Sequence, residues 1–197
     1  MTLGNRRWWW SINTHGFHKT SSIGAITSFS NNCSSLTGWT NTGWTVTTTS
    51  GQTCFSGNGA ANFVCDINTG LTSFKGKTIS FNLYLTGGCP EFVFACNSSG
   101  NGGSTCRWEQ RYSTQSGISI NSNNWFLGSA GQQTYTWGQN VWKAFSIQIT
   151  SGGVATIYVD GVNTGLTCPN ITENGGYIGF NSDGGGGYVS INNITIS

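Results

Sequence analysis

Carboxylates are the first residues to weigh as catalysts, and this chain has few of them. Only six aspartates and glutamates occur in 197 residues. Glycoside hydrolysis needs two carboxyl groups that flank the scissile bond, one as acid and one as nucleophile or base. Glu91 and Glu109 are the pair that neighbouring strands can bring together, because no two acids share one short strand. We therefore predict that the protein is not an enzyme, with a glycoside hydrolase as the least favoured alternative.

Aromatic and amide side chains form the second candidate site. Sugars stack on exposed aromatic rings, and amides hydrogen-bond to their hydroxyl groups. The segment from Trp108 to Trp137 is rich in both kinds of residue. We predict a glycan-binding set within it, and the alternative is that most of these residues lie in the core or at an interface. The predicted set is Trp108, Tyr112, Asn123, Asn124, Trp125 and Trp137.

Metal-binding and nucleophilic patterns are sparse. Both histidines, His15 and His18, precede the first acid, so a Ser-His-Asp triad is not credible. Asp183 stands in Asn-Ser-Asp-Gly, which offers oxygens to calcium, but such a cation prefers several carboxylates. We predict no cofactor and no metal, with calcium at Asp183 as the sole candidate.

The seven cysteines contain no C-x-x-C pair, which argues against a zinc site. An odd number leaves at least one thiol unpaired if the others pair within the chain. We expect several of them to be small buried apolar residues. Some disulfide formation in an oxidising medium stays open as an alternative. The cysteines are Cys33, Cys54, Cys65, Cys89, Cys96, Cys106 and Cys168.

Residues 1–25 differ from the rest of the chain and are interpreted as an N-terminal arm. Arg6 and Arg7 are followed directly by Trp8, Trp9 and Trp10, and no periodicity fits this stretch. We predict that these five residues anchor the chain to a partner subunit. The alternatives are that the tryptophans pack on their own domain or insert into a membrane surface, although no amphipathic helical pattern accompanies them.

Charge and hydropathy exclude two classes of partner. Charged residues make up 7% of the chain and the net charge is +2, so there is no clustered basic face for nucleic acid. No apolar run approaches the roughly 20 residues of a membrane-spanning helix. The N-terminal stretch also lacks the apolar segment that marks a signal peptide.

Two alternating runs show how the candidate residues are positioned. The segment 142–161 reads WKAFSIQITSGGVATIYVDG, in which a Ser-Gly-Gly turn separates the runs and Asp160-Gly161 marks a second turn. Period-two alternation between glycine turns predicts a β-meander. The residues 79, 81, 83 and 85 alternate in the same way, and the pair Asn192-Asn193 interrupts the last alternation, which predicts a bulge.

Short strands therefore alternate with turns from residue 27 onward, and no helix is predicted. That rhythm favours an all-β sandwich or barrel in one domain, residues 26–197. The expected strands are 39–49, 60–67, 78–86, 91–96, 106–113, 118–120 with 125–128, 142–150, 154–159, 177–181 and 188–197.

The meander resembles the concanavalin A-like or laminin G-like jelly-roll superfamily. The matching residues are Trp142, the apolar positions 145, 147 and 149, the Gly152-Gly153 turn and the run 157–161, with 177–180 and 188–196 similar to the closing strands. The resemblance implies an antiparallel jelly-roll sandwich with Trp142 in its core. The superfamily includes lectins, glucanases, adhesive modules and phage structural proteins, and the E-x-D-x-E pattern of its glucanases is absent.

These observations favour a non-enzymatic virion protein, such as a phage head decoration, head fibre or tail-associated subunit. Its arm would bind capsid or tail proteins, its sandwich would face outward toward host or mucus glycans, and repeated copies would form a homo-oligomer. The alternative is a secreted lectin or carbohydrate-binding module. The expected location is the virion surface or, for the alternative, the extracellular medium.

Overall fold

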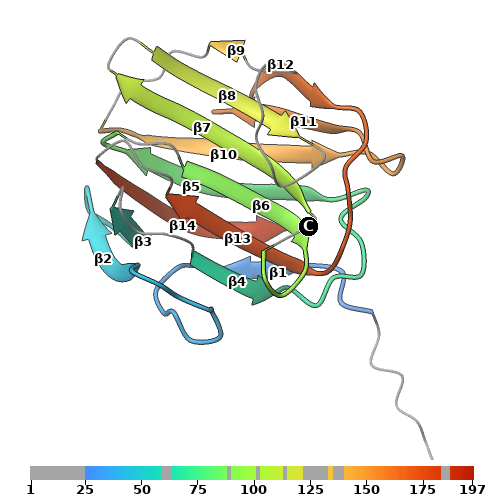
Figure 1. The fold of residues 1–197 in the computed structure, drawn as a ribbon, viewed down its shortest axis with the longest axis horizontal. Coiled ribbons are helices and arrows are strands. Elements are labelled where there is room, and N and C mark those ends of the chain that lie inside the picture. The colour runs from blue at the N-terminus through green and yellow to red at the C-terminus, as the bar shows by residue number, and fades with distance from the viewer. Residues whose placement is uncertain are drawn as a thin grey trace, which may run out of the picture.

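A computed structural model shows an all-β sandwich of the jelly-roll type, which confirms the predicted fold class (Figure 1). The structure describes residues 25–58, 64–87, 90–100, 103–112, 115–121, 133–134, 140–182 and 187–197. These residues contain no helix. Nearly all of the predicted N-terminal arm, with Arg6, Arg7 and Trp8 to Trp10, lies outside the described residues.

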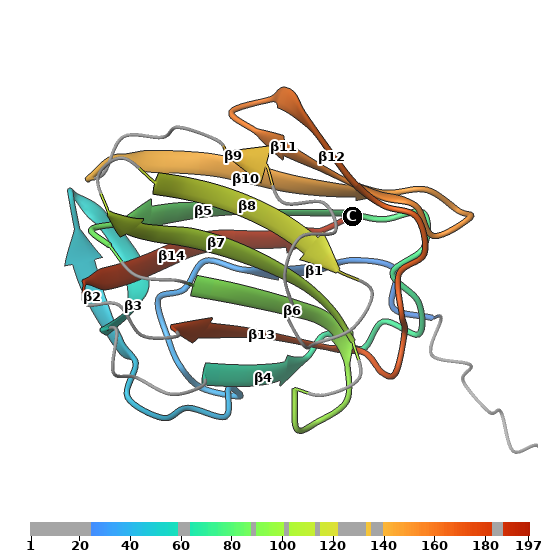
Figure 2. The same ribbon diagram turned by 45° about the horizontal axis from the view of Figure 1, so that its top comes forward.

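Two antiparallel sheets lie face to face, as Figures 1 and 2 show from two directions. The eight-stranded sheet has the order β12 (Val162–Cys168), β11 (Ala155–Val159), β10 (Trp142–Ile149), β5 (Thr78–Leu85), β14 (Tyr188–Ile196), β3 (Gln52–Asn58) and β2 (Thr45–Thr49), with β1 (Phe29–Asn31) also paired to β14. The six-stranded sheet has the order β4 (Val64–Asn68), β13 (Tyr177–Ser182), β6 (Pro90–Cys96), β7 (Ser104–Tyr112), β8 (Gln115–Asn121) and β9 (Gln133–Thr134).

The strands with clear alternation coincide with predicted ones, and the strands that were missed lack such alternation. Residues 78–85, 142–149, 155–159 and 188–196 are strands as predicted. β3 and β12 were not predicted, because both carry glycines that read as turns or interruptions. The predicted strand 39–49 begins only at Thr45.

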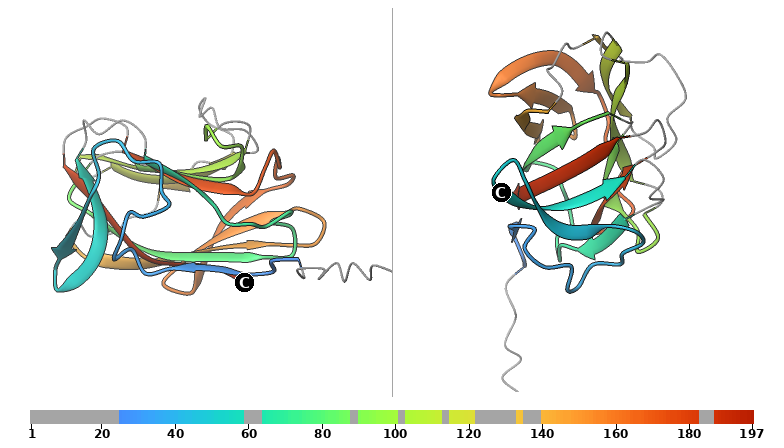
Figure 3. Two further views of the ribbon diagram at one scale, coloured as in Figure 1. Left: turned by 90° about the horizontal axis from the view of Figure 1, so that it is seen from below. Right: turned by 90° about the vertical axis from the view of Figure 1, so that its left-hand side faces the viewer.

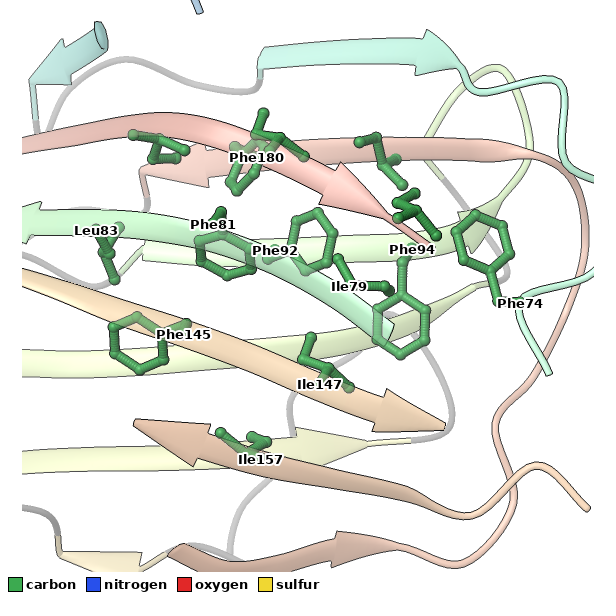
Figure 4. Close-up of a cluster of buried hydrophobic side chains, with 14 of the residues drawn as sticks. Phe74, Ile79, Phe81, Leu83, Phe92, Phe94, Phe145, Ile147, Ile157 and Phe180 are labelled. Atoms are coloured by element: carbon green, nitrogen blue, oxygen red, sulfur yellow. The ribbon is translucent and has the colours of Figure 1, made fainter. Parts of the chain in front are cut away.

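The core fills the space between the sheets with aromatic side chains (Figure 4). Phe81 on β5 meets Phe92 on β6 at 5.0 Å and Phe180 on β13 at 5.6 Å between ring centroids. Phe92 and Phe180 are 4.8 Å apart. The four alternating apolar residues of β5 are all buried, as predicted. Contacts between aromatic rings add to the stabilisation that burial provides, so this cluster ties the two sheets together.

The Asp160-Gly161 turn between β11 and β12 is also confirmed. Both residues have positive φ, 49° and 78°, as a two-residue type I′ hairpin requires. The Asp160 carboxylate accepts hydrogen bonds from Lys143 Nζ at 2.6 Å and from the Ala144 amide at 3.0 Å. These donors favour the ionised form, and the hydrogen bond from Lys143 makes the largest contribution to holding the pKa of Asp160 below its ordinary value of 3.8.

Replacement of Asp160 with asparagine should lower the free energy of unfolding by about 0.5–1 kcal/mol at pH 7, as for other exposed ion pairs. Asparagine tolerates the positive φ, so the turn itself is kept. Because the pKa of Asp160 is lower in the folded state, its contribution is complete above pH 3.8 and is lost as the pH falls through the folded pKa. Urea denaturation of both proteins at pH 7 and at pH 2 measures this, and an equal difference at both values would contradict it.

The predicted bulge at Asn192-Asn193 is present and divides one edge of β14. The register between β14 and β5 shifts between Asn192 and Thr195, and Asn193 has a φ of 53°. Before the bulge β14 pairs with β3, and after it β14 pairs with β1. The β3 strand therefore leaves β14 at the bulge, which frees the β2–β3 hairpin to bend out of the sheet.

Four cysteines in the described part of the chain have buried side chains: Cys33, Cys54, Cys96 and Cys168. Burial raises the pKa of Cys33 to about 12 and also raises that of Cys168. These cysteines behave as the small apolar residues that the sequence predicts.

Candidate functional site

The β2–β3 hairpin lies at one end of the sandwich (Figure 3), and two hydrogen bonds place its tip over the face of the eight-stranded sheet that points away from the core. In a flat sheet β2 and β14 would be about 10 Å apart, and β2 and β10 about 19 Å apart. Instead, the hydroxyl oxygens of Thr49 on β2 and Ser190 on β14 are 3.0 Å apart. Trp142 Nε1 on β10 donates to the Thr49 carbonyl at 3.2 Å. The hairpin tip is therefore held above the middle of the sheet, and the outer face becomes concave beneath it.

Local sequence explains the shape of this hairpin. Ser50 and Gly51 both have positive φ and close β2 and β3 with a two-residue turn. At the base, the Trp44 ring packs on Gly57, where an added Cβ would lie 2.7 Å from the ring. The Asn41 side chain accepts a hydrogen bond from the backbone amide of Trp44 and donates one to the Trp44 carbonyl. The hairpin is thus fixed at its base by one tryptophan and at its tip by another.

A cavity of about 480 Å³ opens between the curled hairpin and the sheet. That volume falls within the roughly 300–1,000 Å³ typical of small-molecule sites. β2 contributes a row of threonines to one wall, and Tyr84, Thr86 and Tyr188 stand opposite. The lining residues are Gly43, Thr45, Thr47, Thr49, Ser56, Asn58, Tyr84, Thr86, Tyr188 and Ser190. None of these residues carries a charge, and most offer a hydroxyl group.

The end of the cavity near the hairpin tip is filled by hydrogen-bonded side chains. Cys54, which is fully buried, donates through Sγ to Thr49 Oγ1 at 3.3 Å. Asn192 Nδ2 donates to Gln52 Oε1 at 2.8 Å, and Asn82 Nδ2 donates to Asn192 Oδ1 at 2.9 Å. Because these groups already satisfy one another, they fix the tip of the hairpin in place.

The described strand residues of the outer face around the cavity are uncharged and include several aromatic rings. The β-strand register places Asn82, Tyr84, Trp142, Ser146 and Tyr158 on it. The Trp142 and Tyr84 rings are 5.4 Å apart. On such a concave surface the aromatic rings can stack on the apolar face of a sugar, and the hydroxyl and amide groups can hydrogen-bond to its hydroxyls.

Two of the predicted glycan-binding residues, Trp108 and Tyr112, lie on β7 of the other sheet, opposite Ile118 and Gln115 in the register. The remaining members, Asn123, Asn124, Trp125 and Trp137, lie outside the described residues, as does Asp183. Within the described part, no three His, Cys, Asp or Glu side chains are grouped closely enough to hold a metal ion.

The structure contradicts the expected core position of Trp142, and it does not pair Glu91 with Glu109. Trp142 is not a core residue, because it pairs with Tyr84 on the outer face and is only half-buried. The register puts Arg107, not Glu109, opposite Glu91. Asn181 Nδ2 donates to a Glu91 carboxylate oxygen at 3.4 Å. The described residues form no helix that is long and apolar enough to cross a membrane.

Sequence reasoning missed the threonines of the cavity wall. The run 45–49 was predicted as part of a strand, but it contains no aromatic, amide or charged side chain that would indicate a binding site. The two tyrosines that line the cavity opposite these threonines, Tyr84 and Tyr188, are more than 100 residues apart in the sequence. The polar positions of β5, alternating with Ile79, Phe81 and Leu83, did indicate which residues face outward.

Comparisons with known proteins support the fold at low sequence identity. No family model matches the chain, and no curated protein is detectably similar in sequence. The carbohydrate-binding module CBM66 from Bacillus subtilis superposes with a TM-score of 0.57 at 14% identity, over 85% of this chain and 98% of that one. The Crh5 transglycosylase in complex with NAG gives 0.54 at 13% identity, over 88% and 84%.

The binding domain of botulinum neurotoxin DC in complex with SialylT gives a TM-score of 0.53 at 12% identity. The superposition covers 89% of this chain and 44% of that domain, so this chain spans less than half of it. Since these similarities extend over most of this chain, it shares the jelly-roll sandwich of carbohydrate-binding and lectin-like proteins.

Proposed function

We propose that this protein binds glycans in the cavity beneath the β2–β3 hairpin and is not an enzyme. The observation that carries this proposal is the uncharged lining of hydroxyls and tyrosines, held in a concave shape by Trp142 and Thr49. The secreted lectin or carbohydrate-binding module, which was the alternative from the sequence, is therefore favoured. The carbohydrate-binding modules among proteins of similar fold support the same class of function.

The chemistry of the lining suits a sugar better than other small molecules. Tyr188, which is 58% exposed, offers a ring at the mouth of the cavity on which a sugar can stack. Thr45 and Thr47 are exposed and present hydroxyls that can donate or accept. The described lining contains no carboxyl group of the kind that sugar hydrolysis requires as acid and nucleophile.

A bulky residue in the cavity provides the test. Thr47→Trp should abolish glycan binding, because the indole occupies the space between β2 and the tyrosines. Thr48→Trp is the matched control, since Thr48 is also exposed and lies next to Thr47 but on the opposite side of the strand. We expect the control to bind as the wild type does. A glycan array followed by titration calorimetry measures both variants.

Equal binding by the two variants would contradict the cavity as the site. Thermal unfolding of each variant shows whether the fold is kept, and tryptophan is well tolerated on exposed strands. If the wild type bound no glycan on a broad array, the proposed function itself would be wrong.

The virion role predicted from residues 1–25 remains a separate proposal. It rests on the Arg-Arg-Trp-Trp-Trp sequence together with the uncharged, Gly-, Ser-, Thr- and Asn-rich composition of the chain. An anchored glycan-binding domain would work on a virion surface or, if secreted, in the extracellular medium. Normal incorporation into particles of a chain that lacks residues 1–25 would overturn the anchoring role.

A further inference from the structure

We infer that the cavity accepts the uncharged terminal sugar of a glycan chain and excludes the interior of the chain. This inference rests on the proposed glycan-binding function and specifies its ligand. It follows from the contacts that close the cavity beneath the hairpin tip and from the described lining residues, which are all uncharged.

The closed end lies beneath the hairpin tip. Three contacts meet there: Thr49 Oγ1 with Ser190 Oγ at 3.0 Å, Trp142 Nε1 with the Thr49 carbonyl at 3.2 Å, and Cys54 Sγ with Thr49 Oγ1 at 3.3 Å. The Trp142 ring also packs on Tyr84 at 5.4 Å. A chain that continued past Thr49 would have to break these contacts, so the tip is a stop.

The side chains that line the cavity become more exposed to solvent with distance from the hairpin tip. Ser190 is 1% exposed, and Thr49 and Tyr84 are half-buried. At the other end Asn58 and Tyr188 are exposed. Among the described residues the cavity therefore has a buried end and an accessible end, which suits a group that enters from one side.

The lining also selects against charge. The ten lining residues that the structure describes are all uncharged. A carboxylate that loses water without gaining a cationic partner is strongly destabilised. Sugars with carboxylate groups, such as uronic or sialic acids, are therefore disfavoured at the buried end, whereas the hydroxyls of neutral sugars find partners in the threonine and serine side chains.

Stoichiometry distinguishes binding at chain ends from binding along the chain. The probes are size-fractionated linear neutral polysaccharides of one type, selected from glucan, mannan, galactan and fructan by the array, at lengths of about 3, 10 and 50 sugars. For each length, titration calorimetry gives the number of protein molecules bound per chain. Thr47→Trp serves as the control that any heat arises from this cavity.

A site for chain ends should bind one protein per linear chain at every length, with similar affinity per end. Oligosaccharides that end in a uronic acid should bind at least tenfold more weakly than the neutral ones. If the number of bound proteins rises with chain length, the inference is wrong although the proposed function stands. If no neutral glycan binds, both are wrong.

Discussion

Replacement of Phe81 with alanine should lower the free energy of unfolding by about 3–5 kcal/mol, as found for large buried aromatic residues. Phe81 is 2% exposed and contacts Phe92, Phe145 and Phe180, which come from both sheets. The lost ring would leave a void at the point where the sheets join. Because domains are stable by only about 5–15 kcal/mol, this change removes a large part of the total. Urea denaturation followed by circular dichroism measures it.

Phe81→Leu is the matched control, because it keeps most of the apolar volume. We expect it to be clearly milder than the alanine variant, since the residual void is smaller. Equal losses for the two variants, or a loss below about 1 kcal/mol for alanine, would show that Phe81 does not join the sheets as the structure indicates.

Replacement of Trp142 with alanine should both destabilise the protein and abolish glycan binding. We expect a loss of about 2–3 kcal/mol, below the value for a fully buried tryptophan, because Trp142 is half-buried. The variant lacks the ring contact with Tyr84 and the hydrogen bond to Thr49, so nothing on β10 holds the hairpin tip. The cavity wall formed by β2 then moves away from Tyr84.

Trp142→Phe separates the two contacts. It keeps an aromatic ring against Tyr84 but lacks the Nε1 donor, so the cost should be near 1 kcal/mol. Its glycan affinity should fall between those of the wild type and the alanine variant. Denaturation and calorimetry on the three proteins test this order. Unchanged binding by the alanine variant would mean that the curled hairpin does not form the site.

The fold could be predicted from the sequence where burial follows a simple period. Residues 79, 81, 83 and 85 alternate because one face of β5 packs on the core and the other does not. The Asp160-Gly161 turn was predictable because few residues accept positive φ. In contrast, β3 was missed, because Gly51 and Gly57 read as turns, whereas Gly57 lies within the strand, where it makes room for the Trp44 ring.

The candidate site was predicted less well, and Trp142 shows why. Its position before an alternating strand indicated a structural residue, but on β10 it faces outward and reaches the tip of a hairpin four strands away in the sheet order. The aromatic residues of the 108–137 segment were predicted as a set because they lie close together in the sequence, and that set stays a prediction. The described lining of the cavity comes from β2, β3, β5 and β14, which are spread widely over the sequence.

By itself, the sequence determined the class of fold, the scarcity of charged residues and the high content of aromatic residues. These properties depend on composition and on periods of two residues, which are local. The tertiary structure alone decided where the cavity lies. That position depends on strand order, on the bulge at Asn192-Asn193 that releases the hairpin, and on the contact between Trp142 and Thr49, which are 93 residues apart. Contacts over such distances arise from how the sheet curls, and no local pattern in the chain encodes them.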